Sequence, residues 1–315
     1  MLKDLKFTDL YIGRDAGLLA GAEHGKDPVP VDSVHAQEVA DLREQCLREM
    51  QATGREDFVV RHGGVSYRVS VIRSLSDTVF VLRRFPDEVP SLKDLRIHPK
   101  LYELLLTPHL SGLVVVAGAF GNGKTTTASS IVAARLRSHG GVAVTIEDPP
   151  EMPLEGRHGE GVCYQTWASK GGFAEACRRA TRWAPTIIFL GEVRDSETAI
   201  EALRASVNGR LVVCTTHADD VVGAIERLQA LASGGGVASD DATQLLSAGL
   251  SAVIHQKLQD FGDRKQLFIR SLWIKGSADE PGIRSTIMAR KFPQLNTIVD
   301  QQRNQMLTQN GPRGF

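Results

Sequence analysis

Leu113-Val-Val-Val-Ala-Gly-Ala-Phe-Gly-Asn-Gly-Lys-Thr-Thr-Thr127 is the stretch that decides the fold. A short apolar run breaks into a glycine-rich turn of the pattern G-x-x-x-x-G-K-[ST], and a helix is predicted from Ala128 onward. Such a strand, loop and helix cradle phosphate groups, because the glycines let successive backbone N–H groups point inward at the helix start. The residues expected to contact a nucleotide are Gly118, Ala119, Phe120, Gly121, Asn122, Gly123, Lys124, Thr125 and Thr126.

Two residues of this loop have specific predicted roles. Lys124 should reach the β and γ phosphates of ATP, and the Thr125 hydroxyl should ligate Mg²⁺, which usually keeps several waters and takes few protein ligands. A glycine turn that carries a lysine by chance is the competing interpretation. The strand before the loop and the helix after it favour the phosphate site, so ATP and Mg²⁺ are the predicted ligands.

The composition limits the kind of protein. The 315 residues are enough for about two domains, and Lys plus Arg (37) balance Asp plus Glu (37). A balanced charge argues against a nucleic-acid partner, because proteins that bind nucleic acids usually carry a basic surface. The cysteines form no C-x-x-C pair and no run of about eighteen apolar residues occurs, so we expect no zinc site and a cytoplasmic protein without a membrane span.

The chain is predicted to have two domains. Residues 1–85 should form a small α+β domain, because a helical spacing of apolar residues is followed, over residues 57–84, by the alternating pattern of strands. Residues 86–99 are the predicted linker, which begins with two prolines in five residues. In residues 100–315, apolar strands alternate with helices, as in an α/β fold with a parallel sheet, and further helices follow at the C-terminal end.

Polar side chains follow several apolar strands of the second domain. The residues at these strand ends are Lys124, Glu147, Glu192 and His217. Ligands of open α/β sheets gather at the carboxyl ends of the strands, so these side chains should converge. Each also has a simpler interpretation, as a solvated carboxylate at a loop edge or a histidine that satisfies backbone groups.

Each of these side chains has a predicted role in ATP hydrolysis. The reaction needs a clamp on the phosphates, a held Mg²⁺ and a group that activates the attacking water. Glu192 is predicted to help hold Mg²⁺, directly or through water, as a Walker B acidic residue. Glu147 is the preferred general base with Glu151 as its rival, and His217 is expected to sense the γ-phosphate through a hydrogen bond.

Four segments together resemble the motifs of the secretion ATPase superfamily, which drives type II secretion, type IV pili and type IV secretion. Residues 118–125, 145–151, 189–195 and 211–217 are similar to its P-loop, Asp box, Walker B and His box. They occur in the order found in that superfamily, and the resemblance covers roughly residues 57–300. One motif of this kind is weak evidence, whereas four in register identify the chain as a member.

Within the superfamily, the chain resembles the PilT-like branch together with the DotB-type and conjugation ATPases. It lacks the four-cysteine insert of extension ATPases, and residues 282–289 partly match the A-I-R-N-L-I-R-E segment of retraction ATPases. The resemblance implies a RecA-like P-loop core with a PAS-like N-terminal domain. It also implies that Arg68, Arg73 and Arg83 reach the nucleotide in a cleft between the domains, with residues 86–90 as a hinge.

The resemblance also implies the function. It predicts a homohexameric motor that hydrolyses ATP to power a type IV pilus, in a retraction-like manner, or a type IV secretion or conjugation machine, through an inner-membrane platform protein. A RecA-like nucleic-acid translocase or helicase is the alternative, opposed by the balanced charge and the lack of basic-aromatic clusters. An ATP-binding scaffold without hydrolysis is opposed by the presence of both Glu147 and Glu192.

Overall fold

The structure is a computed structural model that describes residues 2–14, 16–21, 28–168, 172–234, 236–262 and 265–309. The chain forms two compact units. The first comprises Met1–Glu88 and Pro149–Pro153, and the second comprises Val89–Asp148 and Leu154–Phe315. The chain therefore passes between the units three times, whereas the sequence predicts a single linker.

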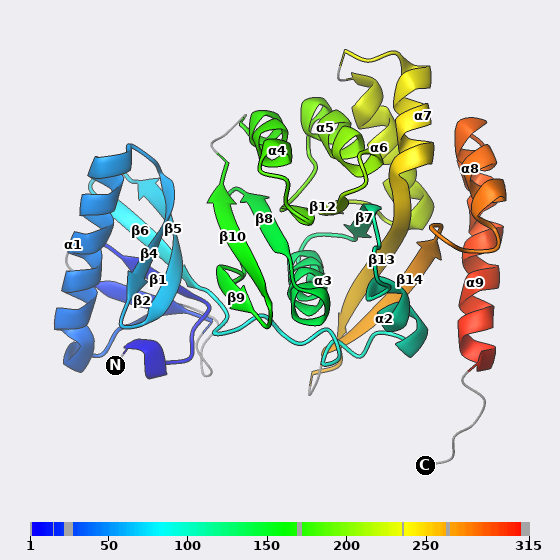
Figure 1. Cartoon of the computed structure of the whole chain (residues 1–315). Coiled ribbons are helices and arrows are strands. Elements are labelled where there is room, and N and C mark those ends of the chain that lie inside the picture. The colour runs from blue at the N-terminus through cyan, green and yellow to red at the C-terminus, as the bar shows by residue number, and fades with distance from the viewer. Residues whose placement is uncertain are drawn as a thin grey trace. The chain divides into compact units, whose positions relative to one another are not determined.

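The first unit is a six-stranded antiparallel sheet in the order β3-β2-β1-β6-β5-β4. Its elements are η1 (Leu2–Asp4), β1 (Asp9–Ile12), β2 (Gly17–Ala20), β3 (Val29–Pro30), η2 (Ser33–His35), α1 (Ala36–Thr53), β4 (Asp57–His62), β5 (Val65–Arg73) and β6 (Thr78–Arg84). Helix α1 packs along the sheet and buries Val39, Leu42 and Cys46 (Figure 1). It ends at Gly54, whose φ of 66° suits glycine.

Strands β1, β2 and β3 have no counterpart among the elements predicted from the sequence. Each has four residues or fewer, which is too short for an alternating pattern to be told from chance. They extend the sheet beyond β6, with which β1 pairs in antiparallel register. Leu10 and Ile12 of β1 are fully buried, as are Phe80 and Leu82 of β6, so the extra strands complete the core of this unit.

The second unit is built on an eight-stranded sheet in the order β14-β13-β7-β12-β11-β8-β10-β9. Its strands are β7 (Gly112–Ala117), β8 (Val142–Glu147), β9 (Gly156–His158), β10 (Gly161–Trp167), β11 (Ile187–Leu190), β12 (Leu211–Thr216), β13 (Leu250–Asp260) and β14 (Lys265–Trp273). The inner strands are parallel, and the edge strands β9 and β14 are antiparallel to their neighbours. Strands β7, β11 and β12 are buried throughout, as expected for strands covered on both faces.

Helices cover both faces of this second sheet (Figure 1). Helix α3 packs on one face, and α4, α5 and α6 pack on the other, as right-handed crossovers between parallel strands require. Helix α7 packs on α5 and α6. The helices are α2 (Pro99–Leu105), α3 (Lys124–His139), α4 (Phe173–Arg182), α5 (Ser196–Val207), α6 (Val221–Gly234), α7 (Ser239–Gly249), α8 (Glu280–Met288), η3 (Phe292–Gln294) and α9 (Leu295–Gln309). In the described part of the chain, no helix has both the length and the apolar character needed to cross a membrane.

Strand β13 is the main departure from the predicted second unit. Helices are expected from the sequence at the C-terminal end of this unit, whereas β13 starts at Leu250 and pairs in parallel with β7. Its first five residues are all buried. A short buried run of this kind cannot be told from a helix segment by periodicity. The consequence for the site is that β13 lies directly beside the loop that follows β7.

Candidate functional site

The P-loop joins β7 to α3 in the shape that a phosphate site requires. Gly121 and Gly123 have φ angles of 75° and 74°, which favour glycine. A Cβ on Gly118 would lie 2.4 Å from the backbone oxygen of Gln256, so no side chain fits there. Gly123 is also the N-cap of α3, so the N-terminal end of this helix, which favours an anion, follows the loop directly.

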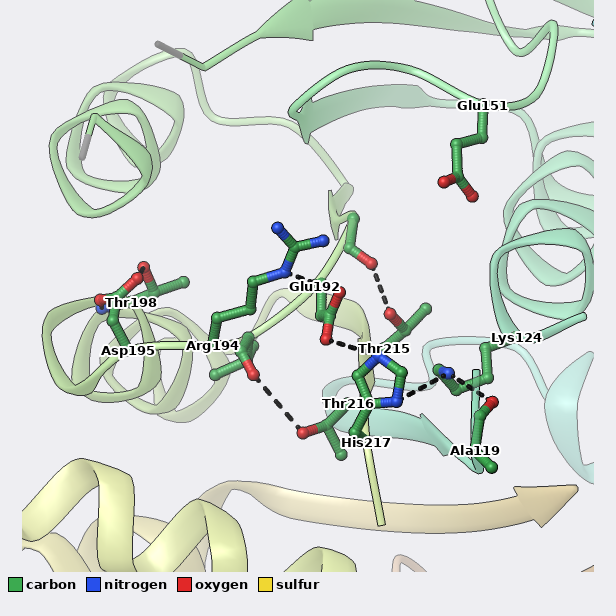
Figure 2. Close-up of polar contacts among 12 residues, drawn as sticks. Ala119, Lys124, Glu151, Glu192, Arg194, Asp195, Thr198, Thr215, Thr216 and His217 are labelled. Carbon is green, nitrogen blue, oxygen red and sulfur yellow. Dashed lines mark hydrogen bonds and ion pairs between the residues drawn. The ribbon is translucent and has the colours of Figure 1, made fainter. Parts of the chain in front are cut away.

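The ammonium group of Lys124 lies over this loop. Its Nζ donates to the backbone oxygen of Ala119 at 2.9 Å and lies 3.5 Å from Nδ1 of His217 (Figure 2). The residue is only 8% exposed. A cation held this close to the loop is placed to transfer its hydrogen bonds to a phosphate oxygen that enters it.

His217 connects Lys124 with Glu192. Its Nε2 lies 3.1 Å from Oε1 of Glu192. An ammonium group only donates and a carboxylate only accepts, so these partners select the tautomer with the proton on Nε2 and a lone pair on Nδ1. Burial, followed by the charge of Lys124, lowers the pKa of His217, and Glu192 opposes this shift by a smaller amount. Burial and Lys124 therefore favour the neutral form of the imidazole.

The carboxylate of Glu192 is held from two sides where the chain leaves β11. Besides the contact with His217, its Oε2 accepts a hydrogen bond from Nε of Arg194 at 2.7 Å. The side chain is 14% exposed, so it is oriented by the protein and still open to solvent. A carboxylate in this setting can ligate Mg²⁺ or orient a water bound to it.

The loop that carries Glu192 is tied down on both sides. The Thr215 hydroxyl on β12 donates to the backbone oxygen of Gly191 (Figure 2). Asp195 then caps α5, because its carboxylate accepts from the backbone N–H and the hydroxyl of Thr198. Glu192 is therefore fixed between the end of β11 and the start of α5.

The two candidates for the general base lie in different units. Glu147 at the end of β8 is 1% exposed, and its Oε1 accepts from Nε2 of Gln165 at 3.0 Å. Glu151 belongs to the first unit, where its side chain is 48% exposed and its Oε1 lies 3.4 Å from Nη1 of Arg68. Solvent water can therefore reach Glu151 much more readily than Glu147.

The three arginines predicted to act on the nucleotide all lie in the first unit, and only two of them are neighbours. Arg68 on β5 and Arg83 on β6 face each other in the sheet register. Arg83 also forms a two-bonded ion pair with Asp9, at 2.8 and 2.9 Å. Arg73 lies five positions after Arg68, which places it on the other strand face, and it pairs with Glu56 at 2.7 Å.

One residue beside the loop is absent from the predicted site. Gln256 on β13 is fully buried, and its Nε2 donates to the backbone oxygen of Asn122 at 2.6 Å. Two positions further along β13, the N–H of Leu258 donates to Oδ1 of Asn122 at 3.1 Å. In the sequence, Gln256 is only the second of two polar residues after the short apolar run of residues 252–254, and without the strand assignment it could not be placed beside the loop.

The polar groups at this site fit ATP together with Mg²⁺. Within the described residues, no cluster of three or more His, Cys, Asp or Glu side chains is arranged around a metal ion. A magnesium ion held by phosphates needs no such cluster, because one or two protein oxygens and several waters complete its coordination. The residues predicted to supply these oxygens are Thr125, in the first turn of α3, and Glu192, which follows β11.

Comparisons with known proteins agree with the motif resemblance. The family model described as Type II/IV secretion system protein matches residues 40–289. The type IV pilus ATPase PilU of Pseudomonas aeruginosa is 30% identical over 208 residues, which are 64% of this chain and 53% of PilU. The uncharacterized protein YggR of Escherichia coli is 32% identical over 81% of this chain and 79% of YggR. The match spans about half the length of PilU and of the competence protein ComGA of Bacillus subtilis.

Two solved structures share the fold over almost the whole chain. The crystal structure of the pilus retraction motor PilT with bound ADP has a TM-score of 0.77 at 27% identity and covers 95% of this chain and 87% of that chain. The X-ray structure of the Legionella pneumophila ATPase DotB has a TM-score of 0.73 at 23% identity, covers 95% and 85%, and supports the fold alone. The predicted fold class, a RecA-like P-loop core with a small N-terminal α+β domain, is confirmed.

Proposed function

The chain belongs to the family of type II/IV secretion system proteins, and we propose that it is a motor ATPase of the PilT and DotB type. The observation that carries the proposal is the connected set of Lys124, His217 and Glu192 beside a glycine loop shaped for phosphates. The names of PilU, a type IV pilus ATPase, and PilT, a pilus retraction motor, support ATP hydrolysis as the source of motor output.

ATP binds at the P-loop, through the first-turn N–H groups of α3 and the side chain of Lys124. When bound, ATP supplies the phosphoryl group that is transferred to water, and Mg²⁺ neutralises charge that develops on it. Thr125 and Glu192 hold the ion, with Glu192 acting directly or through water. The ADP in the PilT crystal structure supports nucleotide binding by a chain of this fold.

His217 reports on the phosphates through its contact with Lys124. When the ammonium group turns toward a phosphate oxygen, Nδ1 of His217 loses its donor while Nε2 still holds Glu192. The lone pair on Nδ1 is then free to accept a hydrogen bond from a water, or the ring can rotate toward the phosphate. Occupation of the loop therefore changes the hydrogen bonding at Nδ1 of His217, the ring whose Nε2 contacts the carboxylate of Glu192.

The activation of the attacking water is assigned to Glu151. A base must come within hydrogen-bond reach of the water that it deprotonates. Glu147, the residue preferred from its position after a strand, is 1% exposed and occupied with Gln165 in this structure, whereas Glu151 is 48% exposed. This difference supports Glu151 as the base, and a comparison of the two Gln variants decides between them.

The proposal extends to assembly and output. The chain would act as a homohexamer from the cytoplasm on an inner-membrane platform protein of a type IV pilus or secretion machine. A retraction-like role in a pilus is supported by the 27% identity to the retraction motor PilT. The assignment of Arg68, Arg73 and Arg83 to the nucleotide, and of residues 86–90 to a hinge, stays a prediction drawn from the motif resemblance. The position of Arg73 on the other strand face favours Arg68 and Arg83 over it.

The experiment measures nucleotide binding and phosphate release by the purified full chain, with and without Mg²⁺. Lys124→Ala should abolish binding, and Glu192→Gln should keep binding but lower turnover by about 10²-fold or more. Glu197→Gln, an exposed carboxylate in the first turn of α5, serves as the matched control and should retain full activity. Mg²⁺-independent release, or full turnover by Glu192→Gln, would exclude this mechanism, and a rate that requires DNA would favour a nucleic-acid translocase.

A further inference from the structure

The tip of the P-loop is attached to β13 by two hydrogen bonds that both end on Asn122. Nε2 of Gln256 donates to the backbone oxygen of Asn122 at 2.6 Å, and the N–H of Leu258 donates to its Oδ1 at 3.1 Å. Because β13 pairs with β7, the strand that leads into the loop, the loop is anchored at its start by the sheet and at its tip by these two bonds.

Gln256 lies against the loop at more than one point. A Cβ on Gly118 would meet its backbone oxygen at 2.4 Å, and a Cβ on Gly123 would lie 3.6 Å from its Nε2. Together with the bond to Asn122, these approaches cover the beginning, the tip and the end of the loop. One residue of β13 therefore shapes the path along which the loop N–H groups are presented to phosphate.

The amide group of Gln256 is not explained by the stability of the core. The residue is fully buried, and its Oε1 has no hydrogen-bond partner among the described residues. A buried acceptor without a partner is destabilising, and an apolar side chain of the same length would remove it. The amide does supply a hydrogen bond from Nε2 to the loop, which indicates that it holds the loop in place.

We propose that Gln256 is a positioning residue for nucleotide binding, which holds Asn122 and with it the P-loop in the curved form that receives the phosphates. This inference rests on the proposed ATPase function and concerns how the same site is kept ready. Gln256 itself touches no phosphate and acts through the loop backbone. Without its donor, the residues between Gly118 and Gly123 sample other conformations, and part of the binding free energy is used to reorder them.

The test separates nucleotide affinity from stability. Gln256→Met keeps the length of the side chain and removes both the donor and the unpaired acceptor. Its Kd for ADP, from titration with a fluorescent ADP analogue, should rise by about tenfold, the size of effect expected for the loss of one hydrogen bond. KM for ATP should rise with it while kcat at saturating ATP changes little. The thermal midpoint without nucleotide should change little, because the removal of the unpaired Oε1 offsets the loss of the hydrogen bond to the Asn122 backbone oxygen.

Controls make the outcome decisive. Gln259→Met changes an exposed glutamine on the same strand and should leave Kd and KM unchanged. Gln256→Asn keeps an amide that is one methylene too short to reach the loop, so it should also raise Kd. This variant takes the place of Gln256→Met if the Met variant does not fold. Wild-type affinity in a folded variant of Gln256, or lost stability with unchanged affinity, overturns the proposal. A wild-type chain that binds no nucleotide refutes the ATPase function itself, before any variant is compared.

Discussion

Nε2 of His217 lies 3.1 Å from Oε1 of Glu192, while Nδ1 of the same ring lies 3.5 Å from Nζ of Lys124. An imidazole between a cation and a carboxylate titrates according to which of them acts more strongly, together with its burial. Burial and Lys124 lower the pKa of His217 by more than Glu192 raises it. The pKa of His217 therefore depends on its contacts with Lys124 and Glu192, and a change in either contact should shift it.

The first prediction concerns the pKa of His217, measured by NMR titration of the imidazole signals. Lys124→Met should raise this pKa, because a cation that disfavours imidazolium is removed, and Glu192→Gln should lower it further, because the carboxylate that favours imidazolium loses its charge. Lys257→Met, at an exposed position of β13, is the control and should leave it unchanged. A pKa that responds to neither Lys124→Met nor Glu192→Gln would contradict the arrangement.

The second prediction is the sign of a pH effect on stability. The folded-state pKa of His217 lies below the ordinary value of 6.5, so on acidification the unfolded chain takes up the proton first. The free energy of unfolding should therefore fall as the pH drops through 6.5, and His255, whose pKa burial also lowers, has the same sign. His217→Gln should make this decrease shallower in urea unfolding at a series of pH values. An unchanged slope would show that His217 does not contribute.

The third prediction compares the two glutamates of the Asp box. Glu151→Gln should lower kcat by about 10²-fold or more with little change in nucleotide affinity, as expected for the loss of a general base. Glu147→Gln keeps an oxygen that can accept from Gln165, so it should reduce kcat much less. Single-turnover phosphate release by both variants is the measurement. The reverse ranking would return the role to Glu147.

The fourth prediction separates the arginines of the first unit. Arg68→Ala and Arg83→Ala should lower ATP turnover, because these two arginines are neighbours on one face of the sheet and both are expected to contact the nucleotide. Arg73→Ala removes only an exposed ion pair with Glu56 on the other face, a contact worth about 0–1 kcal/mol, and should keep turnover near the wild-type rate. Steady-state rates at saturating ATP test this, and equal losses in all three variants would refute the distinction.

The fifth prediction concerns the cap of α5. Asp195→Ala should lower the free energy of unfolding by about 1 kcal/mol, because the N–H and hydroxyl of Thr198 lose their acceptor. Asp240→Ala, an exposed aspartate in the first turn of α7, is the control and should change stability much less. Urea unfolding of both variants gives the comparison. Equal effects would mean that the cap geometry does not stabilise α5.

Much of the second unit could be predicted because its signals are local. The P-loop, the apolar strands β8, β11 and β12 and the cap at Asp195 each depend on residues close together in the sequence. The rule that parallel strands present their carboxyl ends at one edge then places Lys124, Glu192 and His217 in one site, where the structure finds them in contact.

The remaining features depend on residues far apart in the chain. Gln256 is 134 residues from Asn122, and only the pairing of β13 with β7 brings them together. The exposure of Glu151 and the burial of Glu147, four positions apart, follow from the passage of the chain from one unit to the other. The separation of Arg73 from Arg68, in contrast, could be predicted from the sequence, because strand alternation alone places residues five positions apart on opposite faces.

The segment Pro149–Pro153 belongs to the first unit although β8 before it and β9 after it belong to the second. Neither unit is therefore one continuous length of chain, and a single cut near residue 88 would strip the first unit of the glutamate that pairs with Arg68. A chimera that exchanges this unit between relatives must move two separate gene segments to stay intact. For the same reason, recombination at one breakpoint would break up this part of the protein where a transfer of two segments would preserve it.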